Sequence, residues 1–146
     1  MHGDKLVFNL YERALALDTT DIFAVVEAKK VFFIPGQRGF VKGVISFRGN
    51  PVTVVDLKRV FNLPSKNRGP SRIIIAGRAT RAIGLDVGKA SISFLWDEDL
   101  KSTKSLQKKG RYIYDVIEYR NRPIYLLNWY AIFEETVKIL SGSTTT

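Results

Sequence analysis

Residues 43–61 read GVISFRGNPVTVVDLKRVF, and the architecture of the chain follows from this stretch because it occurs twice. Placed without a gap on residues 115–133, DVIEYRNRPIYLLNWYAIF, it is identical at five positions. The identical pairs are Val44/Val116, Ile45/Ile117, Arg48/Arg120, Pro51/Pro123 and Phe61/Phe133. The other positions keep their physical role. The two stretches are therefore predicted to be copies of one structural unit.

Each copy is predicted to form a β-hairpin. Apolar and polar residues alternate before the turn, which is typical of a strand with one buried face. Gly49 and Asn121 occupy the turn, and these two residue types best tolerate a left-handed backbone. Pro51 and Pro123 lack an N–H group, so we expect each at the first residue of the returning strand.

A helix is predicted to begin after each hairpin. Asp56 and Asn128 follow the returning strands, and both residue types are good N-caps. After Asn128, apolar residues recur at helical spacing and Gly142 provides a stop. The apolar positions are Ile132, Phe133, Val137 and Leu140. We expect this C-terminal helix to cover one face of the core.

A weaker match extends the repeat upstream. RALALD at residues 13–18 resembles RAIGLD at residues 81–86, and each follows a short apolar strand. Two similar subdomains are therefore predicted, at about residues 5–62 and 72–140, sharing one core within a single domain of residues 1–146. Each has about five short strands, and closing such a sheet into a small barrel hides its edges. The fold class is mainly β with short helices.

Two segments outside the repeat carry weaker patterns. Residues 21–31, DIFAVVEAKKV, combine helical spacing with β-branched residues, and we interpret them as a short helix running into a strand. Residues 97–109 are polar and lack a strand pattern, so we expect an exposed loop.

Composition narrows the class of protein. The chain has 146 residues, 45% of them apolar, and no cysteine, which suits one folded domain without disulfides or thiolate metal sites. No apolar run approaches the ~18 residues of a membrane helix, and no signal peptide is recognisable, so a cytoplasmic protein is expected. The net charge of +9 fits an acidic partner, nucleic acid or an anionic membrane, but it fits mere solubility equally well.

No catalytic, cofactor or metal site is predicted. The only histidine is His2, near a terminus, and none of the common nucleotide, hydrolase or zinc motifs occurs. The adjacent acids of residues 97–99 lack the spacing of a calcium loop and are interpreted as a solvated turn.

Basic residues followed by aromatics raise nucleic-acid binding as an alternative function. They are Lys101, Lys104, Lys108, Lys109 and Arg111, followed by Tyr112 and Tyr114. Small β-barrels bind single strands with such side chains. Tyr112 and Tyr114 are at strand spacing, however, and one of them is expected in the core, so a solvated loop is the favoured interpretation.

The hairpin motif resembles that of the CheW-like domain family, the chemotaxis coupling proteins and the regulatory domain of their partner histidine kinase. G-V-x-x-x-R-G is present at residues 43–49 and P-V-x-x-x-D-L at residues 51–57. Val25 and Glu27 resemble the V-x-E step of the family, and Pro35 resembles its loop proline. The second half departs from the family pattern, with Asp115 in place of the usual glycine and Asn128 in place of the usual aspartate.

This resemblance implies two SH3-like five-stranded barrels and a scaffold without catalysis or cofactor. Such a protein joins the helical cytoplasmic tip of a chemoreceptor to the regulatory domain of a chemotaxis-type histidine kinase. It is monomeric alone, is assembled into arrays and does not insert into the membrane. By resemblance, Arg48 pairs with the receptor tip, and Val25 and Glu27 lie on the neighbouring surface. The residues alone leave open that Arg48 only completes its hairpin, as Arg120 does, that Val25 is core and that Glu27 is merely solvated.

Overall fold

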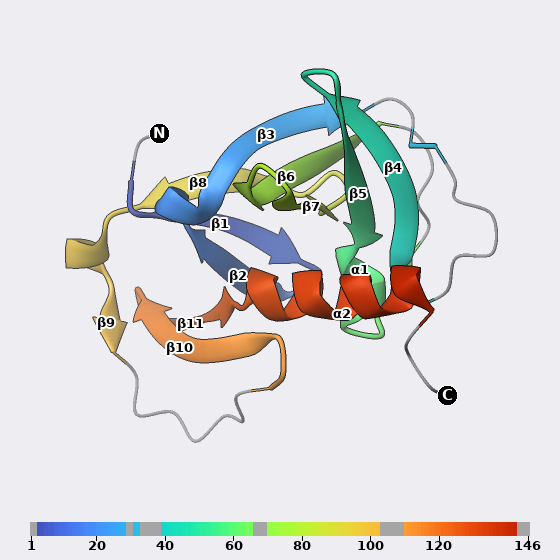
Figure 1. Cartoon of the computed structure of the whole chain (residues 1–146). Coiled ribbons are helices and arrows are strands. Elements are labelled where there is room, and N and C mark those ends of the chain that lie inside the picture. The colour runs from blue at the N-terminus through green and yellow to red at the C-terminus, as the bar shows by residue number, and fades with distance from the viewer. Residues whose placement is uncertain (1–2, 29–30, 33–38, 66–69, 103–109, 143–146) are drawn as a thin grey trace. The chain divides into compact units, whose positions relative to one another are not determined.

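The computed structural model describes residues 3–28, 31–32, 39–65, 70–102 and 110–142, and consists mainly of β-strands (Figure 1). The chain divides into two compact units. Unit 1 comprises Met1–Ile22 and Ala90–Ala131, and unit 2 comprises Phe23–Lys89 and Ile132–Thr146. Each unit therefore contains segments from both halves of the chain, which differs from the two continuous subdomains, at about residues 5–62 and 72–140, that the repeat predicts.

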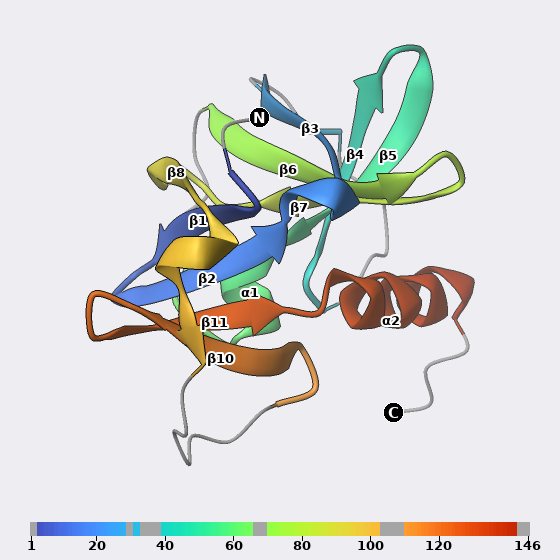
Figure 2. The same cartoon turned by 90° about the vertical axis from the view of Figure 1, so that its left-hand side faces the viewer.

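Unit 1 is built on a six-stranded sheet, one strand more than expected. Its strands are β1 (Lys5–Leu10), β2 (Arg13–Asp18), β8 (Ile92–Leu95), β9 (Lys101–Ser102), β10 (Ile113–Tyr119) and β11 (Arg122–Leu127). They follow the order β8-β1-β2-β11-β10-β9, and Figure 2 shows β1, β2, β11 and β10 side by side. Two 3₁₀ turns, η1 (Thr19–Asp21) and η2 (Asp97–Asp99), follow β2 and β8. The additional strand is the two-residue β9.

Unit 2 contains the five-stranded sheet. Its strands are β3 (Ile22–Ala28), β4 (Val41–Phe47), β5 (Asn50–Asp56), β6 (Ser71–Arg78) and β7 (Arg81–Asp86), in the order β3-β6-β7-β5-β4. The edge strands β3 and β4 are strongly curved (Figure 1). An isolated bridge joins Phe32, beyond the end of β3, to Val44 of β4, so the two edges approach each other. The described α-helices are α1 (Leu57–Val60) and α2 (Trp129–Ser141), and the division between the units falls within α2, after Ala131.

The units mix the two halves of the chain because each repeat contributes its first hairpin to the other sheet. The hairpin β1–β2 pairs in parallel with β11, and the hairpin β6–β7 pairs in parallel with β5. The register is the same in both sheets: Leu126 pairs with Ala16, and the equivalent residue Val54 pairs with Gly84. The repeat is therefore real, but its copies are interleaved.

The second hairpins are also equivalent. Arg48 and Arg120 both have φ of 50°, and the residues that follow them, Gly49 and Asn121, have φ of 80° and 64°. Left-handed backbone at both central residues is the type I′ turn that joins strands with two residues. The sequence pattern located the turn at Gly49 and Asn121, but it did not indicate that the preceding arginines also adopt a left-handed conformation.

The two hairpin prolines lie one residue further into the strand than predicted. β5 begins at Asn50 and β11 at Arg122, so Pro51 and Pro123 are second residues, paired with Ser46 and Glu118. The pair next to the closing pair of a two-residue turn is not hydrogen-bonded, so a missing N–H costs nothing there.

The helix predicted at the start of residues 21–31 is wrong. Asp21 is the last residue of η1, and Ile22–Ala28 form the strand β3; residues 29–30 lie outside the described residues. Exposed and less exposed residues alternate from Phe23 to Ala28, because the β-branched residues favour a strand. Val25 is 41% exposed, so it is not a core residue.

The caps that end the hairpins are present. Asp56 Oδ1 accepts a hydrogen bond of 3.1 Å from the backbone N of Lys58 at the start of α1. Asn128 Oδ1 accepts one of 3.1 Å from the backbone N of Ala131 at the start of α2. At its other end α2 stops at Gly142, where φ is 69°.

Helix α2 buries a narrower face than its apolar spacing predicts. Ile132 and Thr136 are buried, and the Thr136 hydroxyl donates a hydrogen bond of 2.7 Å to the carbonyl oxygen of Ile132. Val137 and Leu140 remain 49% and 45% exposed. The expectation that these two residues pack in the core is wrong.

Candidate functional site

The exposed face of α2 borders an open apolar groove within unit 2, with a volume of about 630 Å³. The turn between β4 and β5, the adjoining residues of β5, the turn between β6 and β7, and one end of β3 provide its other walls. Phe23, Phe47, Arg48, Val137 and Leu140 are the lining residues used below. We call this site the groove.

The groove exists because α2 has two apolar stripes rather than one. Residues three or four positions apart lie on the same side of a helix. Ile132 and Thr136 form the buried stripe, and Phe133, Val137 and Leu140 form a second stripe that lines the groove together with Thr136. Exposed apolar side chains gathered along one groove make it a candidate binding site.

Arg48 lies at the aromatic end of the groove. Its guanidinium Cζ is 5.0 Å from the ring centre of Phe47 and 5.5 Å from that of Phe23. The two rings meet edge to face, with centres 5.6 Å apart and an angle of 85° between them. Attraction between a cation and aromatic faces holds the guanidinium in place while its side chain stays exposed.

Val25 and Glu27 do not line the groove. Both are exposed on β3, at positions two and four after Phe23, and strand periodicity places all three on one face. Phe23 lines the groove, and Val25 and Glu27 lie further along the same face of β3, beyond the groove. Of the three residues suggested by resemblance, the structure brings Arg48 to the groove and sets Val25 and Glu27 along the neighbouring strand.

Sequence reasoning missed most of the groove. Phe23 lies in the segment interpreted as a helix, and Val137 and Leu140 were assigned to the core because their spacing is the same as that of a buried stripe. No sequence pattern distinguishes an apolar stripe that packs internally from one that awaits a partner. The two stripes of α2 could have been suspected, because Ile132 and Phe133 are adjacent and cannot face the same way.

The described lining residues of the groove are mainly apolar. Arg48 is the only charged residue among the described lining residues, and none of them is His, Cys, Asp or Glu. Its threonine hydroxyls thus have no neighbouring base among the lining residues to activate them. Within the part of the chain that the structure describes, no three His, Cys, Asp or Glu side chains gather as a metal site. Nor is any helix there long and apolar enough to cross a membrane.

Two buried aspartates of unit 2 have structural partners. Asp56 and Asp86 are register neighbours on β5 and β7, and each is 1% exposed. Lys42 Nζ lies 2.5 Å from Asp86 Oδ2, and the backbone N of Gly88 donates to Asp86 Oδ1 over 2.8 Å. Ser65 Oγ hydrogen-bonds to Asp56 Oδ2. Both aspartates end their strands, whereas the groove borders the beginning of β5, so they do not belong to the groove.

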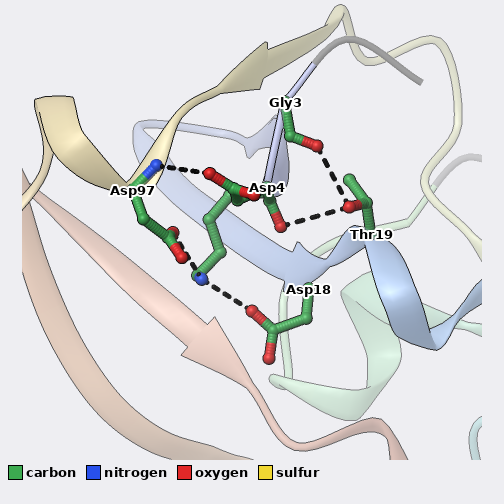
Figure 3. A network of polar contacts seen from close by, with 6 residues as sticks. Gly3, Asp4, Asp18, Thr19 and Asp97 are labelled. Atoms are coloured by element: carbon green, nitrogen blue, oxygen red, sulfur yellow. Dashed lines mark hydrogen bonds and ion pairs between the residues drawn. The ribbon is translucent and has the colours of Figure 1, made fainter.

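A network of hydrogen bonds and ion pairs joins Asp4, Asp18 and Asp97 through Lys5 and backbone groups in unit 1 (Figure 3). Lys5 Nζ lies 2.6 Å from Asp18 Oδ1 and 2.8 Å from Asp97 Oδ1. The backbone N of Asp97 donates to Asp4 Oδ2 over 2.9 Å, and Thr19 N donates to Asp4 O over 3.0 Å. The network ties the N-terminal strand to η1 and η2. Of the acids of residues 97–99, Asp97 is paired with Lys5, and all three lie in the 3₁₀ turn η2, where a turn was predicted.

The pKa values of Lys5 and of the nearby Tyr114 are shifted. Burial alone lowers the pKa of Lys5, but its hydrogen bonds to Asp18 and Asp97 and their negative charges outweigh burial and raise that pKa well above its ordinary value. The pKa of Tyr114 is raised by burial and, next, by the charge of Asp18.

The residues considered for nucleic acid do not form a complete site among those described. Lys104, Lys108 and Lys109 lie outside the described residues. Tyr114 is 46% exposed and Tyr112 is half-buried. The expectation that one of these tyrosines is core is wrong, since the buried residue is Ile113 between them.

Taken together, these features define a two-sheet β protein with an open apolar groove that has an arginine at one end. Residues 4–137 match the family model of the CheW-like domain, and the chain belongs to that family. The chemotaxis protein CheW of Thermotoga maritima is 30% identical over 137 residues, covering 92% of this chain and 91% of that protein. The chemotaxis protein CheW of Bacillus subtilis is 25% identical over 138 residues, covering 91% and 88%.

The fold is shared with a solved structure. The crystal structure of the scaffolding protein TtCheW from Thermoanaerobacter tengcongensis superimposes with a TM-score of 0.70 at 24% identity. The match covers 87% of this chain and 89% of that one. Two curled sheets of five and six strands with a C-terminal helix are therefore the fold of this chain, as expected from its resemblance to the family.

Proposed function

We propose that this protein is a non-catalytic chemotaxis scaffold that couples a chemoreceptor to a chemotaxis-type histidine kinase on the cytoplasmic side of the membrane. Membership of the CheW-like domain family and the names of its relatives, which are chemotaxis and scaffolding proteins, support this role. The regulatory domain of the kinase would bind by barrel-to-barrel contact, and the monomeric protein would assemble with both partners into arrays.

The groove is the proposed receptor site, and its apolar stripe is the observation that carries the proposal. Val137 and Leu140 expose half of their surface to solvent on a helix that is otherwise anchored by Ile132. An amphipathic helix binds such a surface through apolar anchors at helical spacing. The helical tip of a receptor offers that shape, and no small substrate is needed to explain the site.

Arg48 is the proposed polar contact of this site. Its guanidinium is held over Phe23 and Phe47 at the end of the groove, so it can meet a carboxylate of the bound helix without losing side-chain freedom at that moment. Val25 and Glu27 extend the proposed contact along the exposed face of β3. Electrostatic contacts at such a rim set specificity and association rate more than affinity.

The experiment compares Arg48→Asp with Arg120→Asp. Both arginines have φ of 50° at equivalent turns, so aspartate, which tolerates a left-handed backbone, has the same local cost at each. We expect Arg48→Asp to weaken binding of a receptor cytoplasmic fragment about tenfold or more, roughly 1.4 kcal/mol, as measured by calorimetry. Arg120→Asp should bind as the wild type does, and both should melt at nearly the same temperature.

Equal loss of binding in the two variants would overturn the assignment of Arg48 to the receptor site. Unfolding of Arg48→Asp alone would instead mean that Arg48 is a structural residue.

A further inference from the structure

The net positive charge of the chain is carried by one of its two units. Unit 2 contains 14 Lys and Arg residues against 5 Asp and Glu residues, a net charge of +9. Unit 1 contains nine of each and has no net charge. The whole net charge of +9 is therefore carried by the unit that contains the groove. Mere solubility does not require such a division.

A second arginine lies over the same aromatic ring as Arg48. Arg78, the last residue of β6, has its Cζ 5.5 Å from the ring centre of Phe23. Arg48 Cζ is also 5.5 Å from that centre, so the two Cζ atoms are at most 11 Å apart. Arg78 Nη1 donates a hydrogen bond of 2.7 Å to the carbonyl oxygen of Gly77, which helps fix the side chain. Ala79, which follows it, lines the groove.

The fold does not require an arginine at this position. Arg78 and Leu10 are equivalent in the repeat, because each closes the first hairpin of its copy, opposite Arg81 and Arg13. Leu10 is 2% exposed and belongs to the core of unit 1. At this position of the repeat, unit 1 has a buried leucine, whereas unit 2 has an exposed arginine beside Phe23.

We propose that Arg48 and Arg78 form a two-arginine clamp around Phe23, at the aromatic end of the groove, which selects a partner helix carrying carboxylates beside its apolar stripe. This inference rests on the proposed function of the groove and adds the chemistry of its partner. Each guanidinium presents several N–H donors in a plane, a geometry suited to carboxylates. Residues one turn apart on a helix have Cβ atoms about 5–6 Å apart, so two glutamates at i and i+4 can reach two cations held around one ring.

The clamp is expected to act mainly on selectivity. None of the described groove-lining residues is acidic, so a bound carboxylate meets no repulsion from the walls. The excess positive charge of unit 2 attracts the acidic helix over a longer range, and salt screens that attraction. The apolar stripe would supply most of the affinity.

Three synthetic helical peptides test the clamp. All three carry the same leucine stripe, and their two flanking positions at i and i+4 are Glu, Gln or Lys. With the wild-type chain we expect the Glu peptide to bind about tenfold tighter than the Gln peptide, and the Lys peptide to bind weakest, by fluorescence anisotropy at low salt. Raising the salt concentration should reduce the preference for Glu.

Substitutions show which residues cause the preference for the Glu peptide. Arg78→Gln is expected to reduce the Glu-over-Gln preference about threefold, and Arg78→Lys to restore part of it. The double variant Arg48→Gln/Arg78→Gln should abolish the preference. Arg81→Gln, which removes an exposed arginine three positions away in the same hairpin, is the matched control and should keep the preference. Thermal melting checks that each variant is folded.

The outcomes separate the clamp from the groove. If Val137→Glu leaves binding of all three peptides unchanged, the groove is not the site, and the proposed function fails together with the clamp. If Val137→Glu abolishes binding but Arg78→Gln keeps the full preference for Glu, the clamp is refuted and the groove stands. Failure of every peptide to bind the wild type, or equal competition by a single-stranded oligonucleotide, also overturns the clamp.

Discussion

Unit 1 and unit 2 share a hairpin but use it differently. In unit 1, Arg120 lies over one ring, that of Tyr119, at 5.0 Å. In unit 2, Arg48 lies over both Phe47 and Phe23, and Phe23 belongs to a different strand that lines the groove. The repeat therefore preserves the hairpin and its arginine, while the additional ring of Phe23 distinguishes the proposed site. Substitutions at equivalent positions can test this difference directly.

The largest effect is expected at Gly43, which is equivalent to Asp115. A Cβ on Gly43 would lie 2.2 Å from Phe32 O and 2.8 Å from Val31 Cγ1. Gly43→Ala should therefore disrupt the bridge between the edges of the unit 2 sheet and lower the free energy of unfolding by about 3 kcal/mol. Urea denaturation measures this loss.

Asp115→Ala is the matched change in unit 1. That position already carries a side chain, and Asp115 makes a local hydrogen bond of 2.9 Å to Val116 N, so we expect a loss below about 1 kcal/mol. Similar losses of unfolding free energy for Gly43→Ala and Asp115→Ala would contradict the proposed difference between the two positions.

A smaller difference in the loss of stability is expected between substitutions of the two helix N-caps, Asn128 and Asp56. Asn128→Ala removes one hydrogen bond at the start of α2 and should cost about 1 kcal/mol. Asp56→Ala removes a buried cap that also accepts from Ser65, and should cost about 2 kcal/mol. Melting curves compare the two. An unchanged midpoint for Asp56→Ala would mean that its hydrogen bonds add nothing to the stability of unit 2.

The smallest effect concerns pH and the network of unit 1. The pKa of Lys5 is raised in the folded protein, so its stabilisation is complete below its ordinary value of 10.5 and is lost as pH rises above it. The stability difference between the wild type and Lys5→Met should be constant from pH 7 to about 9.5 and shrink above pH 10.5. Urea denaturation at each pH measures it.

Lys5→Arg is the control, because a guanidinium remains charged throughout this range. The difference between Lys5→Arg and Lys5→Met should stay constant. A stability difference between wild type and Lys5→Met that does not change with pH would show that Lys5 is not the group that titrates.

The local features of the fold were predictable, and its long-range pairing was not. Gly49 and Asp56 mark a turn and a cap because backbone conformation and capping depend on a few neighbouring residues. The exchange of first hairpins depends on parallel pairing between strands far apart in the chain, such as Val54 with Gly84, and no local pattern encodes it.

The candidate site was predicted only in part, for a related reason. Arg48 could be singled out because it belongs to a motif, whereas Val137 and Phe23 are apolar residues whose patterns are equally consistent with burial. Arg78 was not singled out, because its proposed role depends on its position over Phe23 and on comparison with Leu10.

The exchanged hairpins also constrain how the chain can fold during its synthesis. The sheet of unit 2 cannot be completed from the first repeat, because β7 occupies its centre and ends only at Asp86. Unit 1 begins with β1 and β2 but must wait for β11 before β2 gains its second neighbour. A ribosome therefore releases most of the chain before either sheet closes, and a chain cut between the repeats would yield two fragments that need each other to fold.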